Sequence, residues 1–138
     1  MVYTVLVDRF RRGDGPAWGA PPEREAGRGG GDLDGVTAAL PHHVDLGVTV
    51  IHLSPIAIAP SAHRYDAVDP RAVDPAIGGE AALARLLEAA HGRGLRVILD
   101  VAATHVDRDF FAFRDVRDRG ARSPYFRWFH VHRHPFTE

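Results

Sequence analysis

One carboxylate and one histidine lie close together in an aliphatic segment. The segment from Leu95 to His105 reads LRVILDVAATH and holds a single acidic residue, Asp100. A near-continuous aliphatic run is typical of a strand buried on both faces in a parallel sheet. Buried ionised aspartates are rare unless they are paired. Asp100 therefore either ends the strand and caps the next loop, or forms a site with His105 at the carboxyl end of the strand, where α/β folds carry their chemistry.

Three further groups of residues have types and spacings that suit binding. His63, Tyr65 and Asp66 stand together in the stretch HRYDAVDPRAVDP, although a tyrosine there, taken alone, is better explained as a loop aromatic covering the core. The run GGG at 29–31 suggests a phosphate cradle, but the residues that complete a nucleotide-binding motif are missing. Alternate histidines, at His130, His132 and His134, fit either metal ligands on one face of a strand or an aromatic-basic surface tail.

Composition limits the function classes. The chain has 138 residues, enough for one domain, and a net charge of -1 argues against nucleic acid or an anionic membrane as partner. Without cysteine, disulfides and thiolate zinc sites are excluded. Neither a signal-peptide pattern nor an apolar run of membrane-spanning length is present. We therefore predict a cytoplasmic protein.

The chain reads as strands alternating with helices. We expect a strand over 2–7, a loop over 11–31, a helix over 34–45, a strand over 48–53, a loop over 56–79, a helix over 80–93 and the strand that begins at Leu95. This order predicts parallel strands with right-handed crossovers. Pro41 conflicts with the first helix, which should kink or restart there. Residues 106–138 are aromatic and basic, and are expected to form a loop-rich excursion.

Five segments in order resemble one known family. They are VYTVLVDRFRRGDG, GGDLDGV, LGVTVIHLSPI, HRYDAVDPRAVDP and HGRGLRVILDVAATH. Together they resemble the amino-terminal part of an α-amylase-family (family 13) glycoside hydrolase of the neopullulanase, cyclomaltodextrinase and maltogenic amylase group. The later segment SPYFRWFHV resembles the start of the small domain inserted after the third strand. The resemblance covers essentially the whole chain.

The resemblance implies an α/β fold, an incomplete (β/α)8 TIM barrel with the first three strands and two helices. Residues 1–106 would be the first part of the catalytic barrel, and residues 107–138 the start of the inserted domain. It also implies retaining hydrolysis or transfer at α-glucosidic bonds of starch-like oligosaccharides, which needs two carboxylates. In the family these lie on later strands, so no residue of this chain is assigned as catalytic, and the chain alone is expected to be inactive.

The resemblance assigns substrate-binding roles to four residues. Tyr65 matches the tyrosine that stacks on the sugar, and His105 matches the histidine that binds its hydroxyls. Asp66 matches a carboxylate that supports the tyrosine. Asp100 matches the carboxylate that orients an arginine near the nucleophile, and that arginine lies beyond this chain.

The family's calcium loop is matched in part by Asp14, Gly30 and Asp32. However, Arg12 stands where the family has asparagine, and Thr104 replaces the asparagine before the histidine. Calcium takes six to eight oxygen ligands, so the site is expected to be weak or lost.

The expected ligand is an α-glucan oligosaccharide, and the remaining barrel as a second chain is a further expected partner. The alternative is a non-catalytic α-glucan-binding module that keeps Tyr65 and His105.

Three strands without the rest of the barrel should leave one face of the sheet uncovered. We expect the side chains of Val5, Val50 and Ile98 to lie on this open face.

Overall fold

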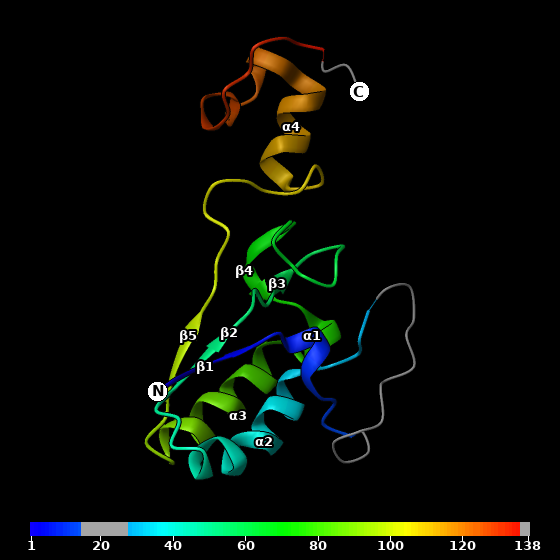
Figure 1. Cartoon of the computed structure of the whole chain (residues 1–138). Coiled ribbons are helices and arrows are strands. Elements are labelled where there is room, and N and C mark those ends of the chain that lie inside the picture. The colour runs from blue at the N-terminus through cyan, green and yellow to red at the C-terminus, as the bar shows by residue number, and fades with distance from the viewer. Residues whose placement is uncertain (15–27, 136–138) are drawn as a thin grey trace.

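The computed structural model describes residues 1–14 and 28–135 of the chain. Its centre is a parallel sheet of three strands in the order β1–β2–β5, where β1 is Val2–Val5, β2 is Val50–Leu53 and β5 is Arg96–Leu99 (Figure 1). The pairing is in register, with Val5 beside Leu53 and Leu53 beside Leu99. The predicted order of parallel strands and crossover helices is confirmed.

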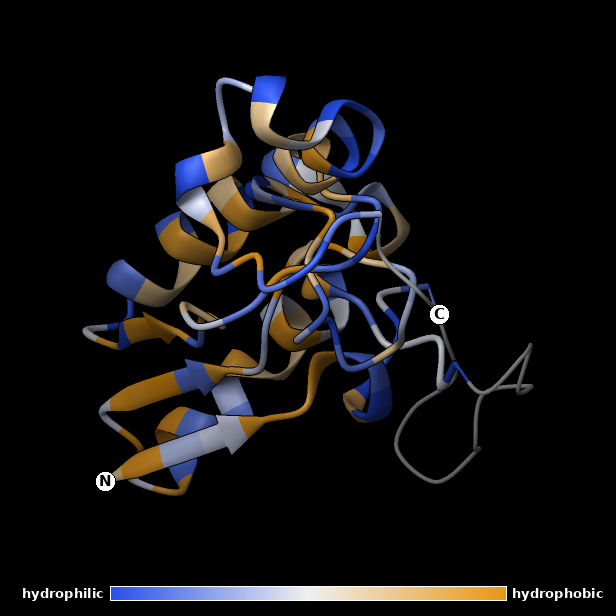
Figure 2. Ribbon diagram, turned by 90° about the horizontal axis from the view of Figure 1, so that it is seen from above, coloured by the Kyte–Doolittle hydropathy of each residue, from blue (hydrophilic) through white to orange (hydrophobic). Residues whose placement is uncertain are grey.

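Two helices cover one face of this sheet. Helix α2 (Leu33–Asp45) lies between α1 (Val7–Phe10) and β2 in the chain, and α3 (Gly79–His91) leads into β5 (Figure 1). Both the strands and the helices of this part of the molecule contain many hydrophobic residues (Figure 2). The fully buried side chains of the layer between them are Val5, Leu33, Val36, Leu40, Ile51, Leu53, Ala82, Leu86 and Ala90. Burial of these apolar groups is the main stabilising contribution.

The other face of the sheet is open and partly polar. Its central pair is Thr4 and His52, whose Oγ1 and Nδ1 atoms are 3.3 Å apart. Ile98 lies beside His52 and is 49% exposed, as expected for the open wall. The placement of Val5 on this face was wrong. Val5 is 1% exposed because it alternates with Thr4 and points toward the helices.

Helix α2 runs through Pro41 without restarting. The side chain of Asp32 caps its first turn by accepting the backbone N–H of Gly35, at 2.6 Å. Proline removes one helical hydrogen bond, but Val36 and Leu40 before it and His43 after it are fully buried. Tertiary packing therefore holds the helix together where its local sequence is unfavourable.

Two segments that were expected to be irregular contain regular elements, and one predicted strand is shorter than expected. Residues 56–79 hold an antiparallel hairpin of β3 (Ala57–Ile58) and β4 (Asp69–Val73), followed by the 3-10 turn η1 (Pro75–Ile77). The strand predicted over 2–7 ends at Val5, and the short helix α1 (Val7–Phe10) follows it. The C-terminal part contains α4 (Phe111–Arg119) and the 3-10 turns η2 (Gly120–Arg122) and η3 (Phe126–Trp128). Such short elements contain too few residues to show a recognisable hydrophobic periodicity in the sequence.

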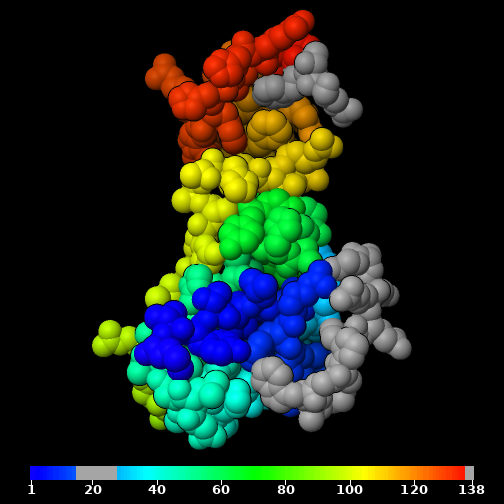
Figure 3. Space-filling model, in the orientation of Figure 1, coloured from blue at the N-terminus to red at the C-terminus, as the bar shows by residue number. Residues whose placement is uncertain are grey.

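The C-terminal part rests on the hairpin rather than on the central sheet (Figures 1 and 3). The backbone N–H of Asp107 donates to the carbonyl of Ala67 at 3.0 Å. The Arg71 guanidinium lies 5.5 Å from the centre of the Phe111 ring, within cation–π range. These contacts join β4 to α4. The assignment of 1–106 to a barrel and 107–138 to an inserted domain stays a prediction.

The glycine run at 29–31 packs on the backbone that follows β1. Gly31 donates its N–H to the carbonyl of Asp8 at 2.9 Å, and Gly29 donates to the Asp8 carboxylate at 2.6 Å. A Cβ atom at Gly31 would overlap the carbonyl oxygen of Val7. Close approach of two backbones therefore accounts for glycine at position 31.

Replacing Gly31 with alanine should lower the free energy of unfolding by about 1–3 kcal/mol, because the added methyl must displace backbone atoms. Urea unfolding followed by circular dichroism measures this. Gly92→Ala is the control, since φ at Gly92 is -60° and a Cβ there comes no closer than 3.3 Å to its neighbours. Equal stability of the Gly31 variant and the wild type would contradict the packing described.

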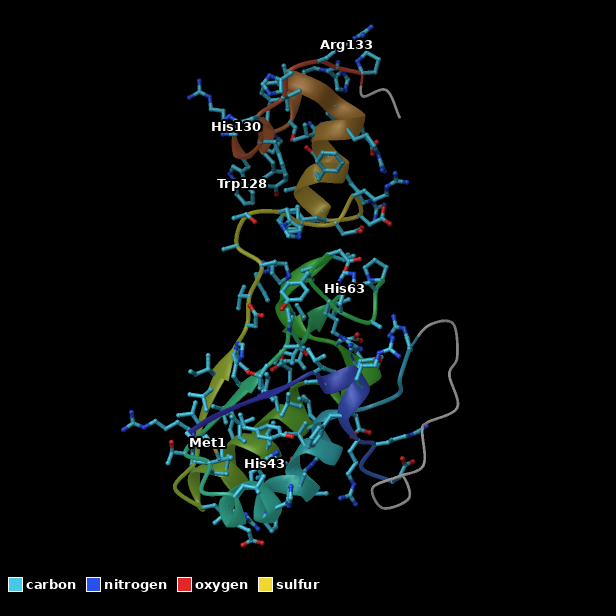
Figure 4. The ribbon with its side chains drawn as sticks, viewed as in Figure 1. Met1, His43, His63, Trp128, His130 and Arg133 are labelled. Carbon is cyan, nitrogen blue, oxygen red and sulfur yellow. The ribbon has the colours of Figure 1, made fainter. Side chains whose placement is uncertain are left out.

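His43 is a fully buried histidine in α2. Its ring lies 4.6 Å from that of Tyr3 and is stacked 5.7 Å from that of Phe10, and neither ring nitrogen has a hydrogen-bond partner among the described residues. Figure 4 shows it among the helices and β1. Burial, and secondarily the neighbouring His42, lower the pKa of His43 below 6.5.

The stability of the chain should therefore fall as the pH drops below about 6.5. In that range the unfolded chain binds a proton at His43 that the folded chain does not, whereas above it the imidazole is neutral in both states. Urea unfolding at a series of pH values tests this. His43→Leu should flatten the pH dependence, and His91→Gln, an exposed position, should leave it unchanged. An unaltered pH profile in His43→Leu would refute the assignment.

Candidate functional site

A short hydrogen bond joins two segments that are distant in the sequence. The hydroxyl of Tyr65 donates to Oδ2 of Asp100 at 2.6 Å. Asp100 directly follows β5, and its backbone N–H donates to the carbonyl of Leu53 at 3.0 Å. These contacts place Asp100 at the carboxyl end of β5, where its carboxylate accepts from Tyr65 and no described hydrogen bond joins it to His105. The carboxylate stabilises the neutral phenol and so raises the pKa of Tyr65 above its usual value.

The turn of residues 61–66, which carries Tyr65, is stabilised by hydrogen bonds among its own side chains and backbone. The Ser61 hydroxyl donates to Asp66 and lies 3.0 Å from Nδ1 of His63. The backbone N–H of Tyr65 donates to the same Nδ1 atom at 3.2 Å. The rings of His63 and Tyr65 are 5.9 Å apart, and Figure 4 shows His63 in the hairpin part of the molecule. The three residues of the predicted group therefore lie together.

Arg64 stands between His63 and Tyr65 and was not singled out from the sequence. It is 2% exposed, and its Nε donates to Oδ2 of Asp74 at 2.8 Å. Only its position inside the HRYD stretch could have marked it, because an arginine in a polar loop is usually exposed.

His105 lies apart from the Tyr65–Asp100 pair in its contacts. It is exposed, and its Nδ1 is 3.2 Å from Oγ1 of Thr104. The described residues record no hydrogen bond between His105 and either Tyr65 or Asp100. The sugar-binding roles of Tyr65, Asp66, Asp100 and His105 stay predictions.

A hollow in the surface adjoins Tyr65. It is bounded by residues just past the ends of β1 and β2 and by the turn around His63. Its lining includes Leu6, Asp8, Arg9, Ser54, His63 and Tyr65. Apolar, acidic and basic groups thus meet beside the exposed aromatic ring, a mixture suited to a polar ligand with flat C–H faces.

The residues predicted for calcium already have protein partners. Oδ1 of Asp32 accepts the backbone N–H groups of Gly13 and Gly35, and Asp14 pairs with Nε of Arg12 at 2.6 Å. Gly30 adopts a positive φ of 81°. The part of the loop from 15 to 27 lies outside the described residues, so the expectation that the calcium site is weak or lost stays a prediction.

The C-terminal histidines do not gather into a metal site. Among residues 1–14 and 28–135, no group of three or more His, Cys, Asp or Glu side chains could hold a metal ion. Nε2 of His134 is 3.0 Å from the carbonyl oxygen of Arg117, and His130 lies near Trp128 at the end of the molecule far from His43 (Figure 4). His130, His132 and His134 are all exposed, as the surface-tail interpretation expects. Within the same described part, no helix is long and apolar enough to cross a membrane.

The chain is similar to known enzymes along almost its whole length. Residues 4–137 match the model of the alpha amylase catalytic domain. The chain is 37% identical to neopullulanase 2 of Thermoactinomyces vulgaris over 147 residues, which cover 100% of this chain and 25% of that protein. It is 34% identical to the intracellular maltogenic amylase of Bacillus subtilis, covering 99% of this chain and 24% of the relative.

A solved structure supports the same relation. It is the cyclic alpha-maltosyl-(1→6)-maltose hydrolase of Arthrobacter globiformis in complex with maltose, which superposes with a TM-score of 0.87 at 34% identity and covers 99% of this chain and 32% of that one. The chain thus spans about a quarter of the length of the curated relatives it matches. Because the match extends over nearly every residue and includes the sheet and the Tyr65 turn, this chain belongs to the alpha-amylase family.

Proposed function

We propose that this chain is the sugar-holding part of a glycoside hydrolase that acts on α-glucosidic bonds of starch-like oligosaccharides. The observation that carries the proposal is the hydrogen bond between Tyr65 and Asp100 at the carboxyl ends of the parallel strands. Such edges are where ligands bind in α/β folds. The related hydrolase with bound maltose supports an α-glucan as the ligand.

Tyr65 is the surface on which a glucose ring stacks. The residue is 38% exposed, while its hydroxyl is fixed by Asp100, so the aromatic face is presented in one orientation. Sugar C–H groups pack well on an aromatic face, and a ring already held in place loses little entropy on binding. The imidazole of His63, whose ring lies 5.9 Å from that of Tyr65, offers a hydrogen bond to a sugar hydroxyl, and Asp66 accepts from Ser61 in the same turn. His105, which is exposed on the segment that follows Asp100, is proposed to bind a further sugar hydroxyl.

The finer fold proposal is that the three strands are part of the wall of a (β/α)8 barrel. The exposed Ile98 on the open face and the outer edge of β5, which no strand of the described residues pairs, support it, since a neighbouring strand would cover both. Residues 107–138 then begin the inserted domain. The two carboxylates of the retaining reaction lie on the remaining barrel, which is the proposed partner whether or not it is a separate chain. The name of the Bacillus subtilis relative supports a cytoplasmic location.

A non-catalytic α-glucan-binding module is the second candidate. This module would use the same Tyr65 surface. The polar pair of Thr4 and His52 on the open face of the sheet favours it, because a wholly apolar face would need a further barrel strand to cover it, and a polar face needs this less. The two functions differ in whether adding the remaining barrel restores hydrolysis.

Tyr65→Ala should weaken the binding of maltotriose about tenfold, because stacking on one aromatic ring contributes about 1 kcal/mol or more. Tyr65→Phe keeps the ring and should weaken binding less. Ligand-observed NMR titration measures both. Tyr125→Ala is the matched control, as Tyr125 belongs to the aromatic cluster of Phe111 and Trp128. Unchanged affinity in Tyr65→Ala would remove the basis of the proposal.

The purified chain should release no reducing sugar from pullulan, starch or cyclodextrins, since the catalytic carboxylates are assigned to strands beyond it. Mixing it with the remaining barrel of a family member should restore turnover. Hydrolysis by the chain alone that disappears in Asp100→Asn would contradict the assignment, because it would place a catalytic carboxylate within these residues.

A further inference from the structure

Arg64 is the largest side chain in the described core that carries a charge. It is 2% exposed, although its neighbours His63 and Tyr65 both reach solvent. Arginine is almost never buried without a partner. Here Nε donates to Oδ2 of Asp74 at 2.8 Å, and Nη1 donates to the carbonyl of Ala62 at 2.9 Å. The guanidinium therefore links Ala62, within the 61–66 turn, to Asp74, which directly follows β4.

Asp74 is itself held in place by the framework of the fold. Its backbone N–H donates to the carbonyl of Ile56 at 2.9 Å, and its Oδ1 accepts the backbone N–H of Ala76 at 2.9 Å as the cap of η1. The turn η1 leads directly into α3, whose Glu80 accepts the backbone N–H of Val73 at 2.9 Å. Asp74 thus offers a fixed anchor that belongs to the helix and hairpin layer.

The backbone at Arg64 is in an unusual conformation. Its φ is +57°, and it is the only non-glycine residue with positive φ in the described part of the chain. This region is unfavourable for residues with a Cβ, so surrounding contacts must hold it. The backbone N–H of Arg64 donates to Oγ of Ser61 at 3.1 Å. The conformation turns the Arg64 side chain inward while the residues on either side face outward.

We propose that Arg64 is a positioning residue for the sugar site. Its ion pair with Asp74 holds the 61–66 turn in the one conformation in which the Tyr65 hydroxyl reaches Asp100. Arg64 does not touch the sugar and acts through Tyr65. The consequence for sugar binding rests on the proposed function, whereas the effect on the Tyr65–Asp100 bond does not.

Two substitutions separate the backbone from the side chain. Arg64→Gly accepts the positive φ but removes the ion pair, and Arg64→Lys keeps a charge that can still reach Asp74. Arg93→Gly is the matched control, because Arg93 is exposed in the turn after α3. A lone buried Asp74 is destabilising, so Arg64→Gly combined with Asp74→Ser provides a variant without an unpaired charge that keeps a capping hydroxyl. Urea unfolding identifies the variants that are folded.

The direct readout is the titration of the Tyr65 phenol, followed by NMR with labelled tyrosine and assigned with Tyr65→Phe. In the wild type the pKa lies above its usual value because of Asp100. In folded Arg64→Gly, or in the double variant, it should return toward the usual value. Arg64→Lys should recover part of the shift, and Arg93→Gly all of it. A folded variant without the ion pair that keeps the full shift would overturn the proposal.

Maltotriose affinity provides the second readout. Arg64→Gly should weaken binding about tenfold, as expected if Tyr65 loses its orientation. If the wild type binds no maltotriose but the Tyr65 titration changes in Arg64→Gly, the positioning role stands and the proposed function fails. If the wild type binds and the variant binds equally well with an unchanged titration, the positioning role fails and the proposed function stands.

Discussion

The in-register parallel pairing of β1, β2 and β5 is the constraint on which the rest of the structure depends. Because Val5, Leu53 and Leu99 are neighbours across the sheet, the three strands end at one edge. The chain leaves that edge into α1, into the hairpin of β3 and β4, and into the segment that begins with Asp100. Tyr65 and Asp100 are 35 positions apart in sequence, and this shared edge is what allows their side chains to meet.

Most of the framework could be predicted from the sequence. The aliphatic runs at 48–53 and after Leu95 and the helical spacing of Leu83, Leu86 and Leu87 are strong local signals, and the structure has β2, β5 and α3 at these places. The grouping of His63, Tyr65 and Asp66 was also visible, because the residues are adjacent. The parallel order followed from the alternation of strands and helices.

What could not be predicted depends on contacts between distant segments. Pro41 indicated a break in α2, and only the burial of Val36 and Leu40 explains why the helix continues. The side of the sheet that Val5 faces depends on where β1 begins, and a shift of one residue reverses it. Arg64 can be buried because it pairs with Asp74, ten positions later, and no local pattern of charge predicts this pairing. The glycine at 31 resembled a ligand motif, yet its role is close packing on Val7.

The site consists of a tyrosine side chain that is held in one orientation and whose aromatic face is exposed to solvent. The Arg64–Asp74 pair and the Tyr65–Asp100 bond fix a tyrosine ring, and the ring's face remains open beside a hollow of mixed polarity. A crystal structure of the chain grown with maltotriose tests this account most directly. We expect a glucose ring against the face of Tyr65, with the Tyr65–Asp100 hydrogen bond intact. Electron density for the sugar on another surface, with the face of Tyr65 empty, would contradict it.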